Sequence, residues 1–375
     1  MLMASFLCSL TISSSCYHQP LSVTRSHGSI TYPYKPTLIS PPKSTSNRNR
    51  LNCCSRLGRT DLVEKPKEVS QATLIWRAVK LPIYSVALIP LSVGAAAAYL
   101  HTGFFSAQRF FSILASSVLI IAWLNLSNDV YDYDTGADKD KKESVVNLLG
   151  SRSGTFLAAT LALILGCSGL ISTSLAAKNT RAILLLACAI FCGYAYQCPP
   201  FRLSYSGLGE PLCFAAFGPF ATTAFYLLLG SHMLTDPPVT GFVLVSSLLV
   251  GFTTSLILFC SHFHQIDGDV AVGKLSPLVR IGTEKAAAMV KFALIFLYGF
   301  LLVCGVAKLL PIACVLLCGI TYPMASLVAN FVKENHFNKE VIFMAKYYCV
   351  RFHTLFGTAL AVGLAISRHF PSIFL

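Results

Sequence analysis

The sequence predicts an all-α polytopic membrane protein, a bundle of about nine transmembrane helices. Hydrophobic residues make up 54 % of the 375-residue chain and charged residues only 12 %, against about 25 % charged in a typical soluble domain. Apolar runs long enough to cross about 30 Å of hydrocarbon, which takes about 20 helical residues, recur to the C-terminal end. The composition excludes a soluble fold, which needs a polar shell, and excludes disorder for most of the chain.

The N-terminal segment has the composition of an organelle transit peptide. Residues 1–60 contain no Asp or Glu and seven Lys or Arg, and they are rich in Ser and contain Pro. The basic residues follow the apolar stretch 2–12, which argues against a secretory signal. The segment also lacks the Arg-rich amphipathic pattern of a mitochondrial leader. We therefore expect a chloroplast transit peptide over residues 1–55, a linker and stromal segment over 56–80, and a membrane domain over 81–375 that carries the activity.

Nine apolar runs supply the expected membrane spans. The fourth run is short, and only the tight link Lys308–Pro311 separates the seventh from the eighth, so the count has a margin of one. In chain order the runs are Leu81–Leu100, Arg109–Ser127, Gly154–Ala176, Ala182–Tyr196, Leu212–Met233, Val239–Ser261, Ala286–Ala307, Leu309–Phe331 and Lys346–Ser367.

The loops between these runs differ in charge. Among the Lys and Arg residues in these loops, most lie after the second, fourth, sixth and eighth runs, and the opposite loops are nearly bare. By the positive-inside rule the charged loops face the stroma, matrix or cytoplasm, and the expected plastid leader selects the stroma. Asp-rich stretches follow only the second and sixth runs, and the even number of spans between them predicts that both stretches lie on this stromal face. The mouth of any active site is expected there.

The first acidic stretch begins inside the second apolar run. If the helix continues, Asn128 and Asp132 share one face, with Asp129 beside them, and Gly136 ends the helix so that Asp138 can turn back. Clustered carboxylates repel one another unless a hard cation binds them, and Mg²⁺ fits because it takes few carboxylates and keeps water and substrate phosphate as its other ligands. The alternative, a solvated charged loop, is disfavoured because acids at membrane depth are costly and usually functional.

The second acidic stretch follows the sixth run and continues into basic residues. Asp267 and Asp269 can supply a second Mg²⁺, and Lys274 and Arg280 can neutralise phosphate charge. Two carboxylate clusters that face each other beside cations form a clamp for a diphosphate. At the mouth of a membrane bundle, such a clamp indicates a lipid diphosphate, with its head in the polar cleft and its tail between helices.

The two motifs together resemble those of the UbiA superfamily of intramembrane aromatic prenyltransferases. The first reads N-D-x-x-D-x-x-x-G-x-D, the second runs into G-K-x-x-x-x-V-R-x-G, and the resemblance covers roughly Leu81 to Ser367. Gly136 stands where many members carry the last Asp of the first motif, and Asp138 follows two residues later. That spacing, with P-P-F-R-L-S-Y-S-G-L-G-E at 199–210, resembles the 1,4-dihydroxy-2-naphthoate prenyltransferase branch. The resemblance implies the UbiA-type helical fold.

With a plastid leader, the resemblance implies phytyl diphosphate as the tail donor. The implied reaction replaces the carboxylate of dihydroxynaphthoate with a phytyl group, releasing CO₂ and diphosphate, on the way to phylloquinone. The implied site residues are Asn128, Asp132, Lys274 and Arg280 for catalysis, Lys139, Arg202, Tyr205, Glu210 and Gln265 for substrate binding, and Asp129, Asp132, Asp138, Asp267 and Asp269 for Mg²⁺.

The second motif departs from the branch pattern D-x-E-x-D-R. Gln265 and Val270 stand at its first and last positions, so one carboxylate and one guanidinium are missing. This favours a hydrogen-bonding role for Gln265 over metal ligation. His262 and His264 are two residues apart and do not share a helix face, so hydrogen bonding to substrate or polar packing is favoured over a metal site there.

Other functions remain open from the sequence. A plastid prenyltransferase with homogentisate or chlorophyllide as acceptor is one, and the Gly136 and Asp138 spacing argues against it. A transporter is another, but transporter acids usually face each other near the bilayer midplane, whereas these lie at span ends. A structural scaffold has no use for clustered acids. The expected partners are a prenyl diphosphate, an aromatic naphthoate and the lipid bilayer, with no nucleic acid. Tail length, acceptor and oligomeric state stay open.

Overall fold

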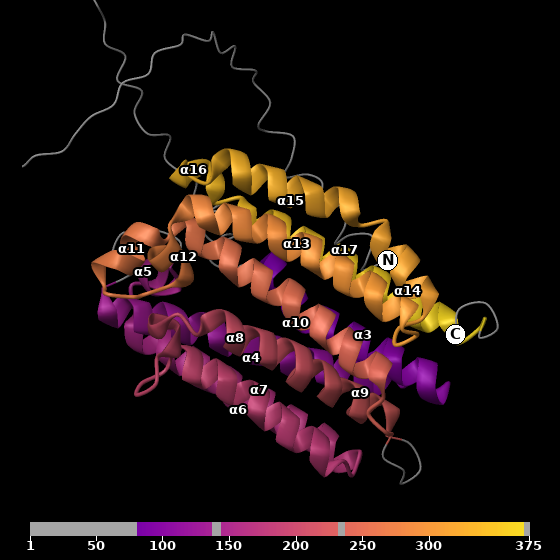
Figure 1. Ribbon diagram of the computed structural model, residues 1–375. Coiled ribbons are helices and arrows are strands. Elements are labelled where there is room, and N and C mark those ends of the chain that lie inside the picture. Colours follow the sequence, from indigo (N-terminus) through magenta and orange to yellow (C-terminus); the bar gives the residue numbers. More distant parts are fainter. Residues whose placement is uncertain (1–80, 137–143, 232–236, 371–375) are drawn as a thin grey trace, which may run out of the picture. The chain divides into compact units, whose positions relative to one another are not determined.

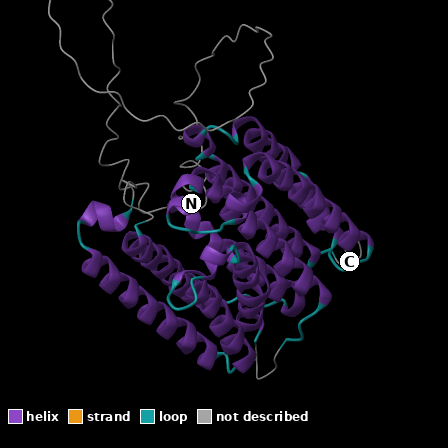
Figure 2. Cartoon of the chain, turned by 60° about the vertical axis from the view of Figure 1, so that its left-hand side comes forward, coloured by secondary structure: helices purple, strands orange, loops and turns teal. Residues whose placement is uncertain are grey.

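The computed structural model describes residues 81–136, 144–231 and 237–370, and within these ranges the chain is helical with no β-strand (Figure 2). The expected transit peptide and linker lie outside the described residues. So do two candidate site residues, Asp138 and Lys139. All of the described residues belong to one compact unit, which spans Val69–Leu375.

Within the described ranges, short connections join one helical element to the next. The first part of the chain forms η1 (Leu81–Tyr84), α3 (Ser85–Thr102), α4 (Ala107–Thr135), α5 (Val145–Leu149), α6 (Arg152–Ala176), α7 (Thr180–Gln197), η2 (Leu203–Ser206), α8 (Gly209–Ala215), η3 (Ala216–Thr222) and α9 (Thr223–Gly230). The rest forms α10 (Gly241–Ser261), η4 (His262–His264), α11 (Ile266–Ala271), α12 (Pro277–Ile281), α13 (Thr283–Val306), α14 (Ile312–Gly319), α15 (Tyr322–Asn335), α16 (Lys339–Ile342) and α17 (Ala345–Ser367).

Eight described helices are long and apolar enough to cross a membrane, and a ninth span results when α14 and α15 count as one. This confirms the predicted fold class. The expected eighth span is the one that differs, because α14 and α15 are bent by 45° at a short break. Pro323 lies in the first turn of α15, where its missing N–H and fixed φ suit a new helix start, and this accounts for the break.

The expected fifth span is continuous but irregular. Helices α8 and α9 are joined by the π-helical η3, which contains Pro219. A proline inside a helix removes one hydrogen bond of the α-helical ladder, and the wider π turn accommodates that loss. The Thr222 hydroxyl donates to the Phe217 carbonyl over 2.7 Å, so the local distortion is bridged by a side chain.

Glycines allow the closest approach between helices that pack on η3. A Cβ on Gly218 would lie 2.8 Å from Cα of Gly251 on α10, and a Cβ on Gly94 of α3 would lie 2.9 Å from the Thr222 carbonyl oxygen. Both contacts are with backbone atoms and are too close for any side chain. Small residues at such crossings let transmembrane helices pack by van der Waals contact, which is the main attraction available in lipid.

The short helices gather at one end of this unit. In Figure 1, α5, α11, α12 and α16 all lie toward the same end of the unit, and α11 contacts α12. These are the segments that follow the two acidic stretches, so the stretches meet at the same end of the bundle, as the span count predicts. The opposite end carries the turns around Gly103 and Lys178, and the link that begins at Lys308.

Candidate active site

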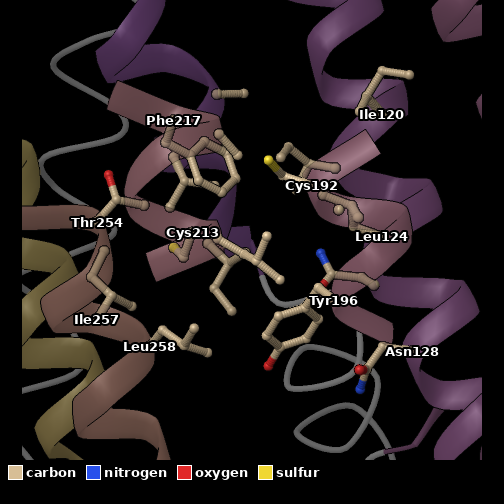
Figure 3. Close-up of a pocket in the computed structure, with 18 of the residues that line it drawn as sticks. Ile120, Leu124, Asn128, Cys192, Tyr196, Cys213, Phe217, Thr254, Ile257 and Leu258 are labelled. Carbon is tan, nitrogen blue, oxygen red and sulfur yellow. The ribbon is translucent and has the colours of Figure 1, made fainter. Parts of the chain in front are cut away.

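A cavity of ≈ 330 Å³ opens between the helices, which is within the usual range for a small-molecule site. Its walls come from α3, α4, α7, α8, η3, α10 and α17. Figure 3 shows that Asn128 and Tyr196 lie at one end of it, while Ile120 and Phe217 lie at the other. The cavity is therefore graded, with a polar end near the short helices and an apolar end deeper in the bundle.

Helix α4 carries the first motif to the polar end. It runs 29 residues before Gly136, in the left-handed conformation at φ 82°, ends it. Asn128 and Asp132 lie one turn apart and both line the cavity, and the Asn128 amide donates to Asp132 Oδ2 over 2.7 Å. The same helix lines the cavity from Ser117 to Asp132, a rise of about 22 Å at 1.5 Å per residue.

Two other acids of the first motif have structural partners. Asp129 is fully buried, and its Oδ2 accepts a hydrogen bond from the backbone N–H of Val145, the first residue of α5, over 3.0 Å. Asp134 accepts two hydrogen bonds from Arg152, over 2.9 and 2.7 Å. These contacts tie the segment beyond α4 back onto that helix, so Asp132 is the motif's acid on the cavity wall.

The two acids of the second motif have different surroundings. The Asp269 side chain is only 6 % exposed, and Lys274 Nζ lies 3.2 Å from its Oδ1. Its Oδ2 is buried without a hydrogen-bond partner among the described residues. The Asp267 side chain is 77 % exposed and pairs with Lys339 over 2.8 Å. Asp269 is therefore the acid with a free coordinating oxygen near the cavity.

Lys274 connects the two motifs electrostatically. It lines the cavity with its side chain 11 % exposed. Burial alone lowers the pKa of a lysine, but Tyr196 and the carboxylates of Asp269 and Asp132 outweigh that effect and hold the pKa of Lys274 above its ordinary value. The residue is therefore a fixed positive charge at the polar end.

Arg280 and Tyr205 fix the loop between α7 and α8. Arg280 donates to the Ser206 carbonyl over 2.8 Å and to the Leu275 carbonyl over 3.2 Å. The Tyr205 hydroxyl donates to Thr135 at the end of α4 over 3.0 Å, and its carbonyl accepts from Leu275 N over 2.9 Å. In this structure both side chains join the loops around the cavity and do not line it.

Arg202, Glu210 and Gln265 lie around the same end. Arg202 has a positive φ of 43°, and its guanidinium carbon lies 5.9 Å from the Tyr131 ring centroid. Gln265 lines the cavity. Glu210 lies behind the wall, with its Oε1 3.1 Å from Nδ1 of His262.

Sequence reasoning did not include the basic end of the last span in the site. Lys346, together with Phe343 and Tyr347, lines the cavity from the start of α17. Its ammonium lies 3.9 Å from the Phe343 ring centroid and 5.3 Å from that of Tyr347. The available signal was a lysine at the head of an apolar run on the expected stromal face, which by itself also fits a positive-inside anchor.

Among the residues that the structure describes, no three His, Cys, Asp or Glu side chains converge as a closed metal site. The oxygen donors at the polar end are Asp132 on the wall and the partnerless Oδ2 of Asp269. Mg²⁺ is commonly held by one or two carboxylates plus substrate phosphate, so this donor set fits an ion that arrives with a diphosphate. It does not suit Zn²⁺, whose sites use at least three protein ligands, mainly Cys sulfur and His nitrogen.

A bundle of apolar helices around a graded cavity, with carboxylates and a buried lysine at its mouth, is the architecture of an intramembrane enzyme for an amphipathic, anionic substrate. The sequence profile described as the UbiA prenyltransferase family matches residues 87–350. The chain belongs to that family, which confirms the resemblance.

The relatives narrow the class further. The chain is 64 % identical over 316 residues to the chloroplastic 2-carboxy-1,4-naphthoquinone phytyltransferase of Arabidopsis thaliana, covering 84 % of this chain and 83 % of that protein. It is 38 % identical to the 2-carboxy-1,4-naphthoquinone phytyltransferase of Synechocystis, covering 80 % and 95 %. The apo structure of a UbiA homologue from Aeropyrum pernix has a TM-score of 0.59 at 13 % identity, covering 76 % and 98 % of the two chains, and it shares the fold.

Proposed function

We propose that this protein transfers a phytyl group from phytyl diphosphate to 1,4-dihydroxy-2-naphthoate, with loss of CO₂ and diphosphate, in phylloquinone biosynthesis. The family and the two naphthoquinone phytyltransferases that it resembles support this reaction. The expected transit-peptide composition and the chloroplastic relative support a chloroplast membrane, with the polar mouth facing the stroma.

The graded cavity is the observation that carries the proposal. A prenyl diphosphate has a highly charged head and a long hydrocarbon tail, and the cavity has a polar end at Asn128, Asp132 and Lys274 followed by apolar walls along α4, α7 and α10. About 22 Å of α4 lines it at 1.5 Å per residue, which gives an extended tail a path into the bundle. A hydrophilic solute has no use for the apolar walls.

Mg²⁺ is the proposed cofactor. Asp132 and Asp269 would hold it, and Asp138 and Asp129 stay candidates from the sequence. When bound, the ion polarises the diphosphate and neutralises part of its charge. Asp267 stays a candidate ligand too, but its pairing with Lys339 at high exposure gives it the weaker claim.

The chain's own groups bind the head and stabilise the leaving diphosphate. Lys274 is a fixed buried cation on the wall, and its charge is worth most as the carbon–oxygen bond breaks and negative charge develops on diphosphate. Gln265 and Asn128 offer amide donors to phosphate oxygens. The apolar walls beyond Tyr196 limit the access of water to the allylic cation while the acceptor is bound. Arg280 holds the loops that close this end of the cavity.

Isolated membranes containing the full chain provide the test. They are incubated with phytyl diphosphate, Mg²⁺ and, in parallel, 1,4-dihydroxy-2-naphthoate or homogentisate, and the prenylated products and released diphosphate are measured. We expect Mg²⁺-dependent prenylation of the naphthoate and none of homogentisate. Prenylation of homogentisate in preference to the naphthoate refutes the acceptor, and diphosphate-independent ion flux without product refutes the enzyme class.

A further inference from the structure

A buried histidine and a half-buried glutamate, whose two carboxylate oxygens are buried, meet at the cavity wall outside the diphosphate clamp. His262 is 2 % exposed and lines the cavity. Glu210, from the first turn of α8, lies behind it, with 3.1 Å between Glu210 Oε1 and His262 Nδ1. Only the histidine lines the cavity, so His262 can contact a substrate and Glu210 can act only through His262.

The polar atoms of this pair are not satisfied by the fold. Both carboxylate oxygens of Glu210 and Nδ1 of His262 are buried without a hydrogen bond of good geometry among the described residues, although the pair is within ion-pair distance. A buried carboxylate without partners is costly, and structural pairs are normally well aligned. Catalytic hydrogen bonds, by contrast, are often misaligned until substrate binds. The geometry is that of a base and the group that orients it.

His262 directly follows α10, whose Thr254, Leu258 and Ser261 line the same cavity. Cys213 lines the cavity from α8, the helix that also carries Glu210, whereas Lys274 and Asp132 belong to the diphosphate end. With Nδ1 directed at Glu210, Nε2 is the nitrogen on the side of the ring that faces away from α8. A planar aromatic acid bound beside the tail's first carbon would present its hydroxyl to that nitrogen.

Resting on the proposed function, we infer that His262, oriented by Glu210, is the residue that takes up and returns the hydroxyl proton of the aromatic acceptor. The allylic carbon–oxygen bond breaks and its electron pair leaves with diphosphate. The ring carbon that bears the carboxylate then bonds to the allylic carbon, the neighbouring C–OH becomes C=O, and its proton passes to His262 Nε2. The carbon–carboxylate bond breaks as CO₂ leaves, its electron pair restores the aromatic ring, and the carbonyl oxygen takes the proton back.

This sequence of steps makes the acceptor's own hydroxyl essential. Electrons and protons balance without an oxidant or a reductant, and the product is the prenylated quinol. The same nitrogen gives and receives one proton, so the pair needs no path to solvent. Glu210 acts through His262 and is a positioning residue, because it stabilises the imidazolium that forms transiently.

The test compares His262→Gln with the wild-type protein in membranes. We expect product formation to fall on the order of 100-fold or more, as for loss of a general base, with the KM for phytyl diphosphate unchanged within about twofold. Diphosphate release continues in the variant, and phytol from capture of the cation by water replaces the product. Glu210→Gln is expected to lower kcat in the same direction by a smaller factor.

His264→Gln is the matched control, because the His264 ring packs edge-on against Phe343 at 4.9 Å between centroids and does not line the cavity. It should leave turnover within about twofold.

A modified acceptor separates proton transfer from support of the fold. The naphthoate whose hydroxyl next to the carboxylated carbon is a methyl ether has no proton to give, so we expect it to slow the wild-type protein and to slow His262→Gln no further. Three results would each overturn the proton-transfer role of His262. They are a wild-type kcat in His262→Gln, an equal loss of product formation and diphosphate release in that variant, and rate losses from the variant and from the methyl ether that simply multiply. If the unaltered protein makes no product from the dihydroxynaphthoate, the proposed function itself fails, and that outcome is distinct.

Discussion

Single and double substitutions of the buried ion pair Lys274–Asp269 should affect stability and prenyl transfer differently. Lys274→Met removes the ammonium and leaves Asp269, with its side chain 6 % exposed, as a carboxylate without its cation. At 3.2 Å and an effective dielectric of about 20, the gross attraction is about 5 kcal/mol. Removing one partner of a buried pair costs about 3–5 kcal/mol, because the other charge stays buried.

The double variant Lys274→Met with Asp269→Asn tests this reasoning. Removing both charges also removes the stranded carboxylate, so most of the lost stability should return. Prenyl transfer should not return, since both the cation and the proposed ligand oxygen are gone. Lys285→Met, at an exposed lysine of α13, is the control for loss of a lysine.

Thermal unfolding in detergent and turnover in membranes measure the two effects. A single-variant loss of about 3–5 kcal/mol corresponds to roughly 6–10 °C in Tm at about 2 °C per kcal/mol for a large domain. An unchanged Tm in Lys274→Met, or a double variant less stable than the single one, would refute the buried-pair account.

The pKa of Lys274 determines how the Tm difference between the wild-type protein and Lys274→Met depends on pH. Its folded pKa is above the ordinary value of 10.5, so the stabilisation from protonated Lys274 is fully present below that value and is lost only as pH rises through the folded pKa. The Tm difference between wild type and Lys274→Met should therefore stay flat from pH 6 to pH 9. A difference that disappears within that window would show that Lys274 is not held protonated.

Three further outcomes are expected. Asp132→Asn should lower prenyl transfer on the order of 100-fold or more, while the protein accumulates normally. Asp267→Asn, which changes an exposed ion pair, should lower it by less than about fivefold. A Mg²⁺ titration in membranes measures both variants, and the reverse ranking would contradict the choice of Asp132 over Asp267 as the Mg²⁺ ligand. Ala189 lies two turns deeper than Tyr196 on the cavity wall, so Ala189→Phe should block the far end of the tail. When phytyl and geranyl diphosphate compete, the ratio of their products should shift at least tenfold toward geranyl, because each excluded five-carbon unit loses up to about 4 kcal/mol of burial at about 0.8 kcal/mol per CH₂. An unchanged ratio would show that the tail binds elsewhere. Removing residues 1–55 should leave turnover in a heterologous membrane intact and abolish plastid import, and loss of turnover would assign that segment to the enzyme.

The helical bundle was predictable because membrane solvation acts on every residue. Backbone groups in hydrocarbon must be satisfied within the segment, so an apolar run of sufficient length has one solution. The break between α14 and α15 was less accessible. Pro323 is visible in the sequence, but the 45° bend depends on how α14 packs against α17, which a run of apolar letters does not encode.

The candidate site was predictable where helix periodicity fixes direction. Asn128 and Asp132 are four residues apart, and both line the cavity from α4. Loop side chains have no such constraint. Arg280 turns to the Ser206 carbonyl, and Asp267 turns to Lys339, partners that lie far along the chain. The contribution of Lys346 from the last span was missed for the same reason, since only the tertiary fold brings it to the cavity.

The balance of charge at the polar end explains why an amide at position 265 is compatible with this chemistry. Gln265 precedes Asp269 by one turn, with Asp269 N donating to the Gln265 carbonyl over 2.8 Å, and it lines the same cavity. A carboxylate there would add a negative charge to a site that already holds Asp132 and Asp269, and among the described residues Lys274 and Lys346 are the lysines that line the cavity. The amide donates a hydrogen bond, which an ionised acid cannot do, and so favours a bound diphosphate without repelling it. With an amide in place of a carboxylate at position 265, the site needs less positive charge to bind the diphosphate of the substrate.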